Sequence, residues 1–361
     1  MKYSLKLAHL FIVILTAGYL TACAAPQSVG PQASTFEIER EAQKQRALAF
    51  RRNIADQEKI FATSFPLMAA NADFCGKNTR PLYGLVAWNT SALPYNYQNI
   101  ARQEFGLTEQ LAVKSVAKYS PAYNAGLRKG DRLISINGEP LKHTKEAYQQ
   151  LINLMTMSGY RPIEVFYQRG SEILTGHLQP VTGCAYPVLL SSESNINAYA
   201  DGNKIVISKG ILRFTENQDE LALVIAHELA HNAMLHINQK QTNVLAGGLG
   251  GLAIDALLGA AGVSTGNQFS RLGQQMGSMA YSVAFEQEAD YIGMYYLSRA
   301  GYTTNYVADF WRRMASDGSA NIDQARTHPT SPQRFLAIEK THDEISYKKQ
   351  QGLSLTPNMK K

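Results

Sequence analysis

The chain has 361 residues, of which 45% are apolar and 18% are charged, and its formal net charge is +6. This length allows one large domain or two ordinary ones, and the apolar fraction is enough for a packed core, so the composition excludes wholesale disorder. The positive excess is small, and aromatic residues do not alternate with the basic ones. We therefore expect no nucleic-acid partner.

The first 22 residues have the pattern of a secretory signal peptide. Lys2 and Lys6 form a short basic region, and the apolar run 10–20 that follows is too short to span a membrane as an anchor. The run ends in Leu-Thr-Ala-Cys, which resembles the lipobox of bacterial lipoproteins, whose cysteine, here Cys23, is acylated. Ala24 stands where an aspartate usually retains such proteins at the inner membrane, so the resemblance implies a lipid anchor at the periplasmic face of the outer membrane. An ordinary cleaved signal with a coincidental cysteine is the alternative.

Two further cysteines, Cys75 and Cys184, remain in the chain. An exported protein with two remaining cysteines most simply pairs them. The disulfide would close a loop of roughly a hundred residues, which the chain-entropy model values at about 4 kcal/mol. Two buried free thiols are the alternative.

The segment before this loop has two parts. Residues 23–35 are predicted to be a flexible tether, and the charged helical pattern of 36–61 predicts a surface helix. We assign 36–100 to an N-terminal helical segment that packs on a larger domain.

Residues 101–181 have the pattern of a small β-rich domain with two helices. Strand, short helix, strand, helix and strand follow one another at 111–116, 121–126, 132–136, 144–155 and 163–170. This order, and the run SPAYNAGLRKGDRLISINGEPL at 120–141, resemble a PDZ domain of the bacterial, circularly permuted kind.

The resemblance implies a domain that binds extended peptides, often C-terminal tails, by adding a strand to a sheet edge. In that family the peptide carboxylate lies on a glycine-containing loop before the second strand, and the nearest match here is Phe105-Gly106-Leu107. A domain that binds no free peptide and only packs on its neighbour is the alternative.

A buried helix is predicted at 217–238, with Asn217 in the N-cap position. On this helix His227 and His231 are four residues apart, so both imidazoles lie on one face, and each can place a nitrogen about 2.0–2.1 Å from one zinc ion. Glu228 is next to His227 and can reach a zinc-bound water without being a ligand. This is the arrangement of HExxH metallopeptidases.

A zinc site of this kind needs a third protein ligand. His236 is one residue early for the metzincin spacing, and the glycine of that pattern is absent, so we assign His236 a structural role. The helical pattern at 285–301 offers Glu286 as the ligand and Asp290, four residues later, to accept a hydrogen bond from a ligand histidine. Glu288 points to another side of this helix and is expected to be a surface acid.

These motifs resemble the zinc metallopeptidases of the HtpX and CAAX prenyl protease type, which include periplasmic BepA-like and Oma-like members. The similar features occur in the family's order: NAYADGNKIVISKGIL at 197–212, HELAH, Glu286-x-x-x-Asp290, and His328-Pro329 with Arg334. The resemblance implies one zinc ion per chain and an edge strand that lines the cleft. It assigns the metal ligands His227, His231 and Glu286, the catalytic base Glu228, and the supporting residues Asp290 and Arg334.

The resemblance also implies an α+β fold. A mostly helical, zincin-type metallopeptidase domain with a small edge-strand sheet is expected at 182–340, beside the PDZ domain. A polar C-terminal tail is expected at 341–361.

His328 is a second candidate for catalysis. In the family a histidine of the His-Pro motif lies near the metal, where it stabilises the oxyanion, or occupies the open metal position and holds the enzyme off. A loop histidine that caps nearby backbone is the alternative.

The run VLAGGLGGLAIDALLGAAGV at 244–263 has the length of a membrane span. It contains several glycines and Asp255, and it lies between two helices that must converge on one metal. We therefore expect a buried or lid-like helical hairpin beside the cleft. Contact with a membrane or with a partner complex is the alternative.

Together these features predict a zinc-dependent endopeptidase of the cell envelope that degrades unfolded or misassembled proteins. The PDZ domain would select or present their tails, or regulate access. The alternatives are a latent protease that acts mainly as an assembly chaperone or peptide-binding adaptor, and a lipoprotein adaptor in which zinc only stabilises the fold. Structural zinc sites normally have four protein ligands, so both alternatives gain if His328 is the fourth.

Overall fold

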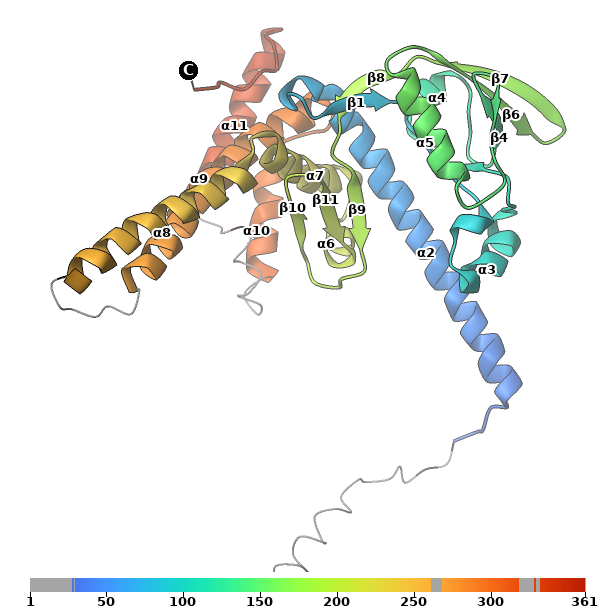
Figure 1. The fold of residues 1–361 in the computed structure, drawn as a ribbon, viewed down its shortest axis with the longest axis horizontal. Coiled ribbons are helices and arrows are strands. Elements are labelled where there is room, and N and C mark those ends of the chain that lie inside the picture. Colours follow the sequence, from blue (N-terminus) through green and yellow to red (C-terminus); the bar gives the residue numbers. More distant parts are fainter. Residues whose placement is uncertain (1–27, 29, 261–267, 318–327, 329–331, 361) are drawn as a thin grey trace, which may run out of the picture. The chain divides into compact units, whose positions relative to one another are not determined.

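The computed structural model covers most of the chain, and the described residues are 28, 30–260, 268–317, 328 and 332–360. The predicted signal peptide and Cys23 lie outside these residues. The chain divides into two compact units, Met1–Leu48 and Ala49–Lys361. Helix α2 (Thr35–Ala70) begins in the first unit and ends in the second, which contains all later elements (Figure 1).

Helix α2 is longer than its charge pattern predicts, because it continues past Phe61. Its last turns are apolar and buried, and Ile60, Leu67 and Met68 belong to the core of the second unit. Pro66 lies inside this stretch. Tertiary packing of an apolar face supplies most of the stability of a protein helix, and here it outweighs the tendency of proline to end one.

A six-stranded antiparallel sheet forms the β-rich domain, in the order β2-β3-β4-β6-β7 with β5 paired to β4. Its strands are β2 (Leu85–Trp88), β3 (Ala112–Val116), β4 (Arg132–Ile136), β5 (Glu139–Pro140), β6 (Ile163–Arg169) and β7 (Glu172–Leu178). The helical elements of this domain are η3 (Thr90–Ala92), α3 (Tyr95–Phe105), α4 (Pro121–Asn124) and α5 (Ala147–Ser158). The predicted strands and two helices are present, but the sheet begins at β2, before the predicted boundary at 101.

Alternating burial explains why these segments form strands. Along β6, Ile163, Val165 and Tyr167 are buried while the residues between them are partly exposed. Side chains of a strand alternate between its two faces, so one face of the sheet enters the core, where Leu151 and Met155 of α5 join it.

The rest of the second unit is mainly helical. Its helices are η2 (Ala72–Phe74), α6 (Lys209–Phe214), α7 (Gln218–Ala233), α8 (His236–Ala260), α9 (Gln268–Arg299), α10 (Val307–Asp317) and α11 (Pro332–Gln350). A three-stranded sheet has the order β10-β11-β9, and its strands are β9 (Val188–Ser191), β10 (Ala198–Ala200) and β11 (Ile205–Ser208). One apolar core joins α7, α9, α11 and β11. The helical part and the β-rich part together confirm the predicted α+β fold.

A two-stranded ribbon lies where the chain enters and leaves the β-rich domain. Its strands, β1 (Thr79–Leu82) and β8 (Val181–Cys184), pair antiparallel. A disulfide joins Cys75 to Cys184, whose Cα atoms are 5.5 Å apart. The predicted pairing therefore ties the two ends of the domain together.

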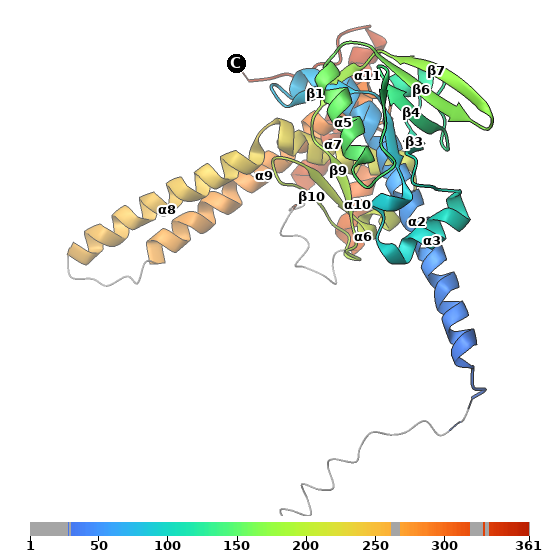
Figure 2. The ribbon, with the colours of Figure 1, turned by 45° about the vertical axis from the view of Figure 1, so that its right-hand side comes forward.

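Helices α8 and α9 lie side by side (Figures 1 and 2). The predicted hairpin is therefore present within the described residues. Of the two forms that we expected, buried or lid-like, the leucines of α8 at 245, 249 and 252 contradict the buried one, because they are exposed. Only one side of α8 can face α9, and these side chains lie on other sides. Residues 261–263 of the predicted segment lie outside the described part. Among the described residues, no helix is both long enough and apolar enough to cross a membrane.

The predicted polar tail at 341–361 is wrong for its first part. Helix α11 continues to Gln350, and Thr341 and Ile345 are buried. Most residues of this segment are polar or charged, so its few apolar side chains, which pack in the main core, are hard to recognise in the sequence.

Candidate functional site

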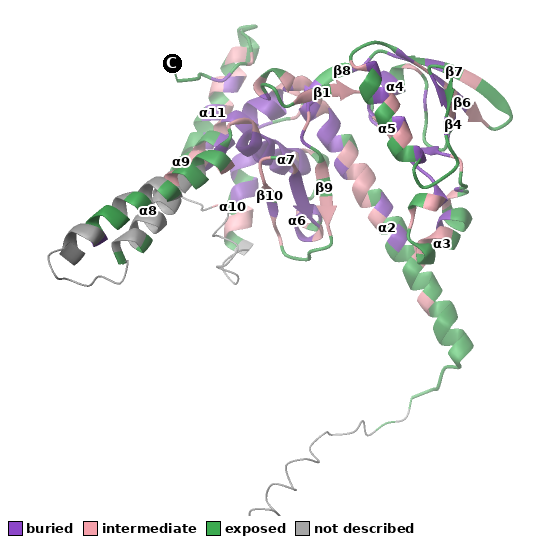
Figure 3. Ribbon diagram, in the orientation of Figure 1, coloured by how far each residue is buried: buried purple, intermediate pink, exposed green. Residues whose placement is uncertain are grey.

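Helix α7 carries the HELAH motif through the middle of the core. The side chain of Asn217 accepts a hydrogen bond of 2.9 Å from the backbone N–H of Glu220, which caps the helix as predicted. Nearly the whole helix is buried (Figure 3). His227 is 0% exposed and Glu228 is 2% exposed, so these polar groups need partners within the fold.

Helix α9 supplies those partners from one of its faces. Glu286 and Asp290 are one turn apart, and Gly293 follows on the same face. A Cβ on Gly293 would lie 3.3 Å from the Cα and the backbone nitrogen of His227, so the absence of a side chain there lets α9 approach α7 closely. Gly293 was not predicted, because a glycine within a helical sequence gives no signal of which helix it will face.

Four predicted side chains meet in one cluster, formed by His227, His231, Glu286 and His328. Nε2 of His227 lies 3.1 Å from Nε2 of His231 and 3.3 Å from Oε2 of Glu286, and Nε2 of His231 lies 3.2 Å from Oε1 of Glu286. Four ligand atoms placed tetrahedrally at 2.0–2.1 Å from zinc are about 3.3–3.4 Å apart. The cluster therefore has the donor set and the spacing that fit a zinc ion.

His328 contacts both the metal cluster and the predicted base. Its Nδ1 lies 3.3 Å from Nε2 of His227 and 2.9 Å from Oε2 of Glu286. Its Nε2 lies 3.3 Å from Oε1 of Glu228. Nδ1 thus lies where a fourth metal ligand would be. The alternative, a loop histidine that caps nearby backbone, does not account for these side-chain contacts.

Asp290 and Arg334 contact residues of the cluster without belonging to it. The guanidinium of Arg334 donates to both oxygens of Asp290, at 2.7 and 2.9 Å, and Arg334 is 1% exposed. Oδ1 of Asp290 lies 3.2 Å from Nδ1 of His227. The Asp290 carboxylate therefore lies between a buried cation and Nδ1 of His227, the ring nitrogen that faces away from the cluster.

Burial and charge set the protonation of the cluster. Burial alone would lower the pKa of His227, but Asp290 and Glu286 outweigh it and raise that pKa to about 10. Burial would raise the pKa of Glu286, but the surrounding histidines hold it well below its ordinary value. For His231, burial dominates and lowers the pKa. The acids therefore keep the His227 ring in its positively charged form, with a proton on each nitrogen. A metal ion that binds this ring would have to displace one of these protons.

His236 and Glu288 adjoin the cluster without being in it. Nδ1 of His236 lies 3.0 Å from Nδ1 of His231, and Nε2 of His236 lies 3.0 Å from Oε2 of Glu288. Burial lowers the pKa of His236 to about 4. Glu288 lies outside the ligand set, as expected, but its interaction with a buried histidine was not predicted.

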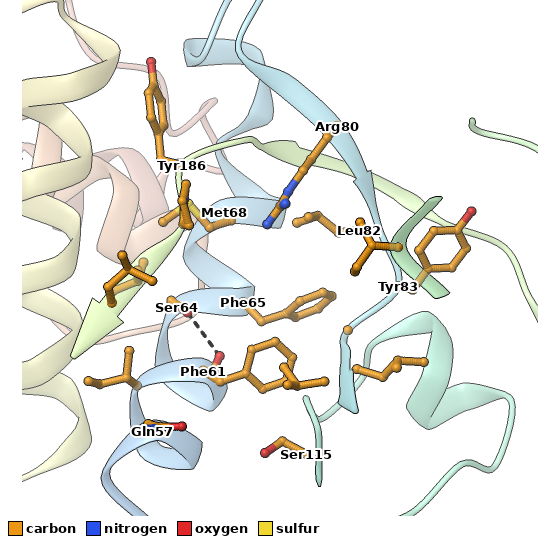
Figure 4. A pocket seen from close by; sticks show the side chains of 18 of the residues that line it. Gln57, Phe61, Ser64, Phe65, Met68, Arg80, Leu82, Tyr83, Ser115 and Tyr186 are labelled. Carbon is orange, nitrogen blue, oxygen red and sulfur yellow. Dashed lines mark hydrogen bonds between the residues drawn. The ribbon is translucent and has the colours of Figure 1, made fainter. Parts of the chain in front are cut away.

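A second candidate site is a cavity of about 800 Å³ between α2, the segment from β1 to β2, α5 and β9 (Figure 4). Phe61 and Phe65 of α2 form part of one wall. Apart from the cations Arg80 and Lys114, the lining is uncharged. Strand β2, at one edge of its sheet, lies along the cavity.

The predicted carboxylate loop is not in this cavity. Gly106 instead ends α3 in the left-handed conformation, and Leu107 is buried in a separate apolar cluster. The glycine that lines the cavity is Gly84, which directly precedes β2 and has φ +74°. A Cβ on Gly84 would lie 2.1 Å from Cβ of Ser120, so the turn requires glycine. The Tyr-Gly-Leu sequence at 83–85 was the available signal, but it lay outside the domain boundary that we predicted.

Comparison with known proteins gives matches to both parts of the chain. Residues 174–342 match the sequence profile of peptidase family M48, and residues 112–154 match that of a PDZ domain. The chain is 32% identical over 153 residues to mitochondrial metalloendopeptidase OMA1 of Schizosaccharomyces pombe, which covers 41% of this chain and 44% of that protein.

Two bacterial proteins are also similar to part of the chain. Identity to the beta-barrel assembly-enhancing protease of Yersinia pestis is 30% over 157 residues, or 40% of this chain and 32% of that protein. Identity to the protein of the same name from Escherichia coli is 29% over 157 residues, or 41% of this chain and 30% of that protein. The matched region thus spans less than half the length of each of these relatives.

Proposed function

Since this chain belongs to peptidase family M48 and carries a PDZ domain, we propose that it is a zinc-dependent endopeptidase of the cell envelope that degrades unfolded or misassembled proteins. The observation that carries the proposal is the cluster of His227, His231 and Glu286 beside Glu228, all buried and spaced for one metal ion. Protein zinc sites for catalysis have three protein ligands and an open position, and these residues supply the three.

Glu228 performs the proton transfers of the proposed reaction. A zinc ion held by the three ligands would polarise the scissile carbonyl and lower the pKa of a water molecule. The Glu228 carboxylate, next to His227 on α7, takes the proton of the attacking water and then delivers it to the leaving amine. Glu228 is 2% exposed, so bulk water competes little for this proton.

The small sheet suits an extended substrate. Strand β10 pairs only with β11 among the described strands, so its other edge can pair with a substrate backbone. Asn232, one residue after His231, accepts from the backbone N–H of Gly202 and donates to the carbonyl of Lys204, at 2.8 and 3.1 Å. These bonds attach the turn between β10 and β11 to the metal-binding helix. An unfolded chain meets the requirement for an extended backbone.

The cavity at Gly84 is the proposed site for the tails of such proteins. Strand β2, whose outer edge has no partner among the described strands, the apolar walls and two cations match an apolar C-terminal segment that ends in a carboxylate. We further propose that Cys23 anchors the protein by lipid to the periplasmic face of the outer membrane. The Cys75–Cys184 disulfide supports an oxidising compartment.

A latent form of the enzyme is the second candidate, and the position of His328 favours it. Nδ1 of His328 lies beside Glu286 and His227, where a fourth ligand would close the metal site. Its Nε2 lies near Glu228, so the same side chain also covers the base. In this form the protein would bind unfolded proteins and cleave them only after His328 moves away from the metal ligands and Glu228.

Digestion of casein by the mature, zinc-loaded chain tests the proposal. We expect cleavage by the native protein and a loss of at least about a hundredfold in Glu228→Gln, because that change removes the base. The exposed Glu172→Gln on β7 is the matched control and should cleave normally. If the native protein binds zinc but does not cleave, His328→Ala distinguishes the candidates: activity in this variant supports the latent form, and its absence contradicts the peptidase.

A further inference from the structure

Two residues, Met234 and Leu235, separate helices α7 and α8, and the second of them lies in the left-handed region. Leu235 has φ 59°, a conformation that glycine adopts easily and a leucine adopts rarely. Its side chain is 51% exposed, so burial does not account for a leucine at this turn. The turn brings His236, the first residue of α8, back onto the end of α7. Backbone strain of this kind persists where the surrounding structure holds it, and it is common at functional sites.

The ring of His236 is held on three sides. It is 2% exposed, and it stacks on Phe285 with the ring centroids 4.6 Å and the planes 16° apart. One ring nitrogen lies 3.0 Å from His231 and the other lies 3.0 Å from Glu288. Both polar atoms of a buried ring are therefore used, and the stacking fixes the plane in which they lie.

The direction of each hydrogen bond follows from Glu288. An ionised carboxylate only accepts, so Nε2 of His236 donates to Glu288 and Nδ1 of the same neutral ring must accept. The proton between the two Nδ1 atoms therefore belongs to His231. That tautomer leaves the lone pair of Nε2 of His231 directed toward Nε2 of His227 and the Glu286 carboxylate.

We propose that Glu288 and His236 are positioning residues, which fix the tautomer and the ring orientation of His231 for metal binding. Such outer partners are a general requirement of metal-binding histidines. His227 has a different arrangement, in which Asp290 contacts its Nδ1 directly. Different residues therefore hold the two histidines of α7: Asp290 contacts His227, and His236 contacts His231. The inference rests on the proposed zinc site and deepens it.

Zinc affinity tests the inference without any measurement of catalysis. We would titrate the metal-free mature chain with zinc against a chromophoric chelator. Glu288→Ala removes the acceptor at a half-exposed position, and His236→Phe keeps the ring that stacks on Phe285 but removes its nitrogens. Each variant should raise the zinc Kd by about 10- to 100-fold. The exposed Glu172→Ala on β7 is the control and should leave Kd unchanged.

The double variant makes the test specific. Glu288 acts through His236, so adding Glu288→Ala to His236→Phe should cause no further loss of affinity. Zinc Kd values within twofold of native in both single variants would overturn the inference, as would fully additive losses in the double variant. Native protein that binds zinc and cleaves casein leaves the peptidase standing in either case. Native protein that binds no zinc overturns both proposals.

Discussion

The candidate metal-binding cluster and the cavity at Gly84 are built in opposite ways. The cluster brings charged and polar side chains into the core and gives each of them a partner, as Arg334 does for Asp290. The cavity is lined mainly by apolar side chains, and it has a glycine where no side chain fits. A buried charge depends on its partner and a close-packed turn depends on free space, so removing an atom damages the first site and adding an atom damages the second.

Asp290→Ala should have the largest effect on stability, a loss of about 3–5 kcal/mol in the free energy of unfolding. Arg334 would remain 1% exposed without the carboxylate that accepts two of its hydrogen bonds. Chemical denaturation measures the loss. The matched control is Asp309→Ala, which removes an exposed aspartate that also pairs with an arginine, Arg312. The control should leave stability nearly unchanged, and equal losses would show that burial of the pair is irrelevant.

Gly84→Ala should cost about 2–3 kcal/mol, because the new Cβ adds a clash to an unfavourable φ. The clash is with Ser120, whose Cβ would be 2.1 Å away. Gly138 has a similar φ of +81° with nothing within 4 Å, so Gly138→Ala isolates the backbone strain. It should cost only about 1–2 kcal/mol. Zinc affinity should be native in both variants, and a weaker affinity in Gly84→Ala would show that the two sites are not independent.

Counted per pH unit, the smallest effect concerns the pH dependence of zinc binding. With a pKa of about 10, the His227 ring is positively charged throughout the neutral range, and zinc must displace one of its two ring protons. The apparent association constant for zinc should therefore fall by about tenfold for each unit that the pH falls from 8 to 6, or about 1.4 kcal/mol per unit. Chelator competition at three pH values measures the slope. A flat profile would contradict the assignment of a proton to His227.

Spacing along one helix was sufficient to predict part of the metal cluster. His227 and His231 meet because residues four apart share a helix face, and Glu286 and Asp290 meet for the same reason on α9. His328 was predicted only from the family resemblance. It lies 101 residues from His227 in the chain, so no helical spacing relates the two. Glu288 lies outside the cluster of candidate ligands, and its bond to His236 depends on how α8 folds back on α9.

The cavity that we propose to bind peptides was harder to locate from the sequence. The tripeptides Phe-Gly-Leu at 105–107 and Tyr-Gly-Leu at 83–85 have similar sequences. The first lies at the end of a helix, and the second lines the cavity. Only the pairing of β2 with β3 brings Gly84 into the sheet of the PDZ domain. Strand pairing depends on residues distant in the chain, so local pattern cannot decide between two such candidates.

The sequence by itself determined the features that repeat with the period of one element. These are the two helices that carry the candidate metal ligands, the alternating strands and the apolar cores. Backbone hydrogen bonding sets those periods within each segment, so neighbours along the chain are enough to reveal them. The tertiary structure decided which faces meet: His328 against Glu228, His236 against His231, and α2 against the groove at Gly84. These contacts depend on packing between distant segments, which no local period encodes.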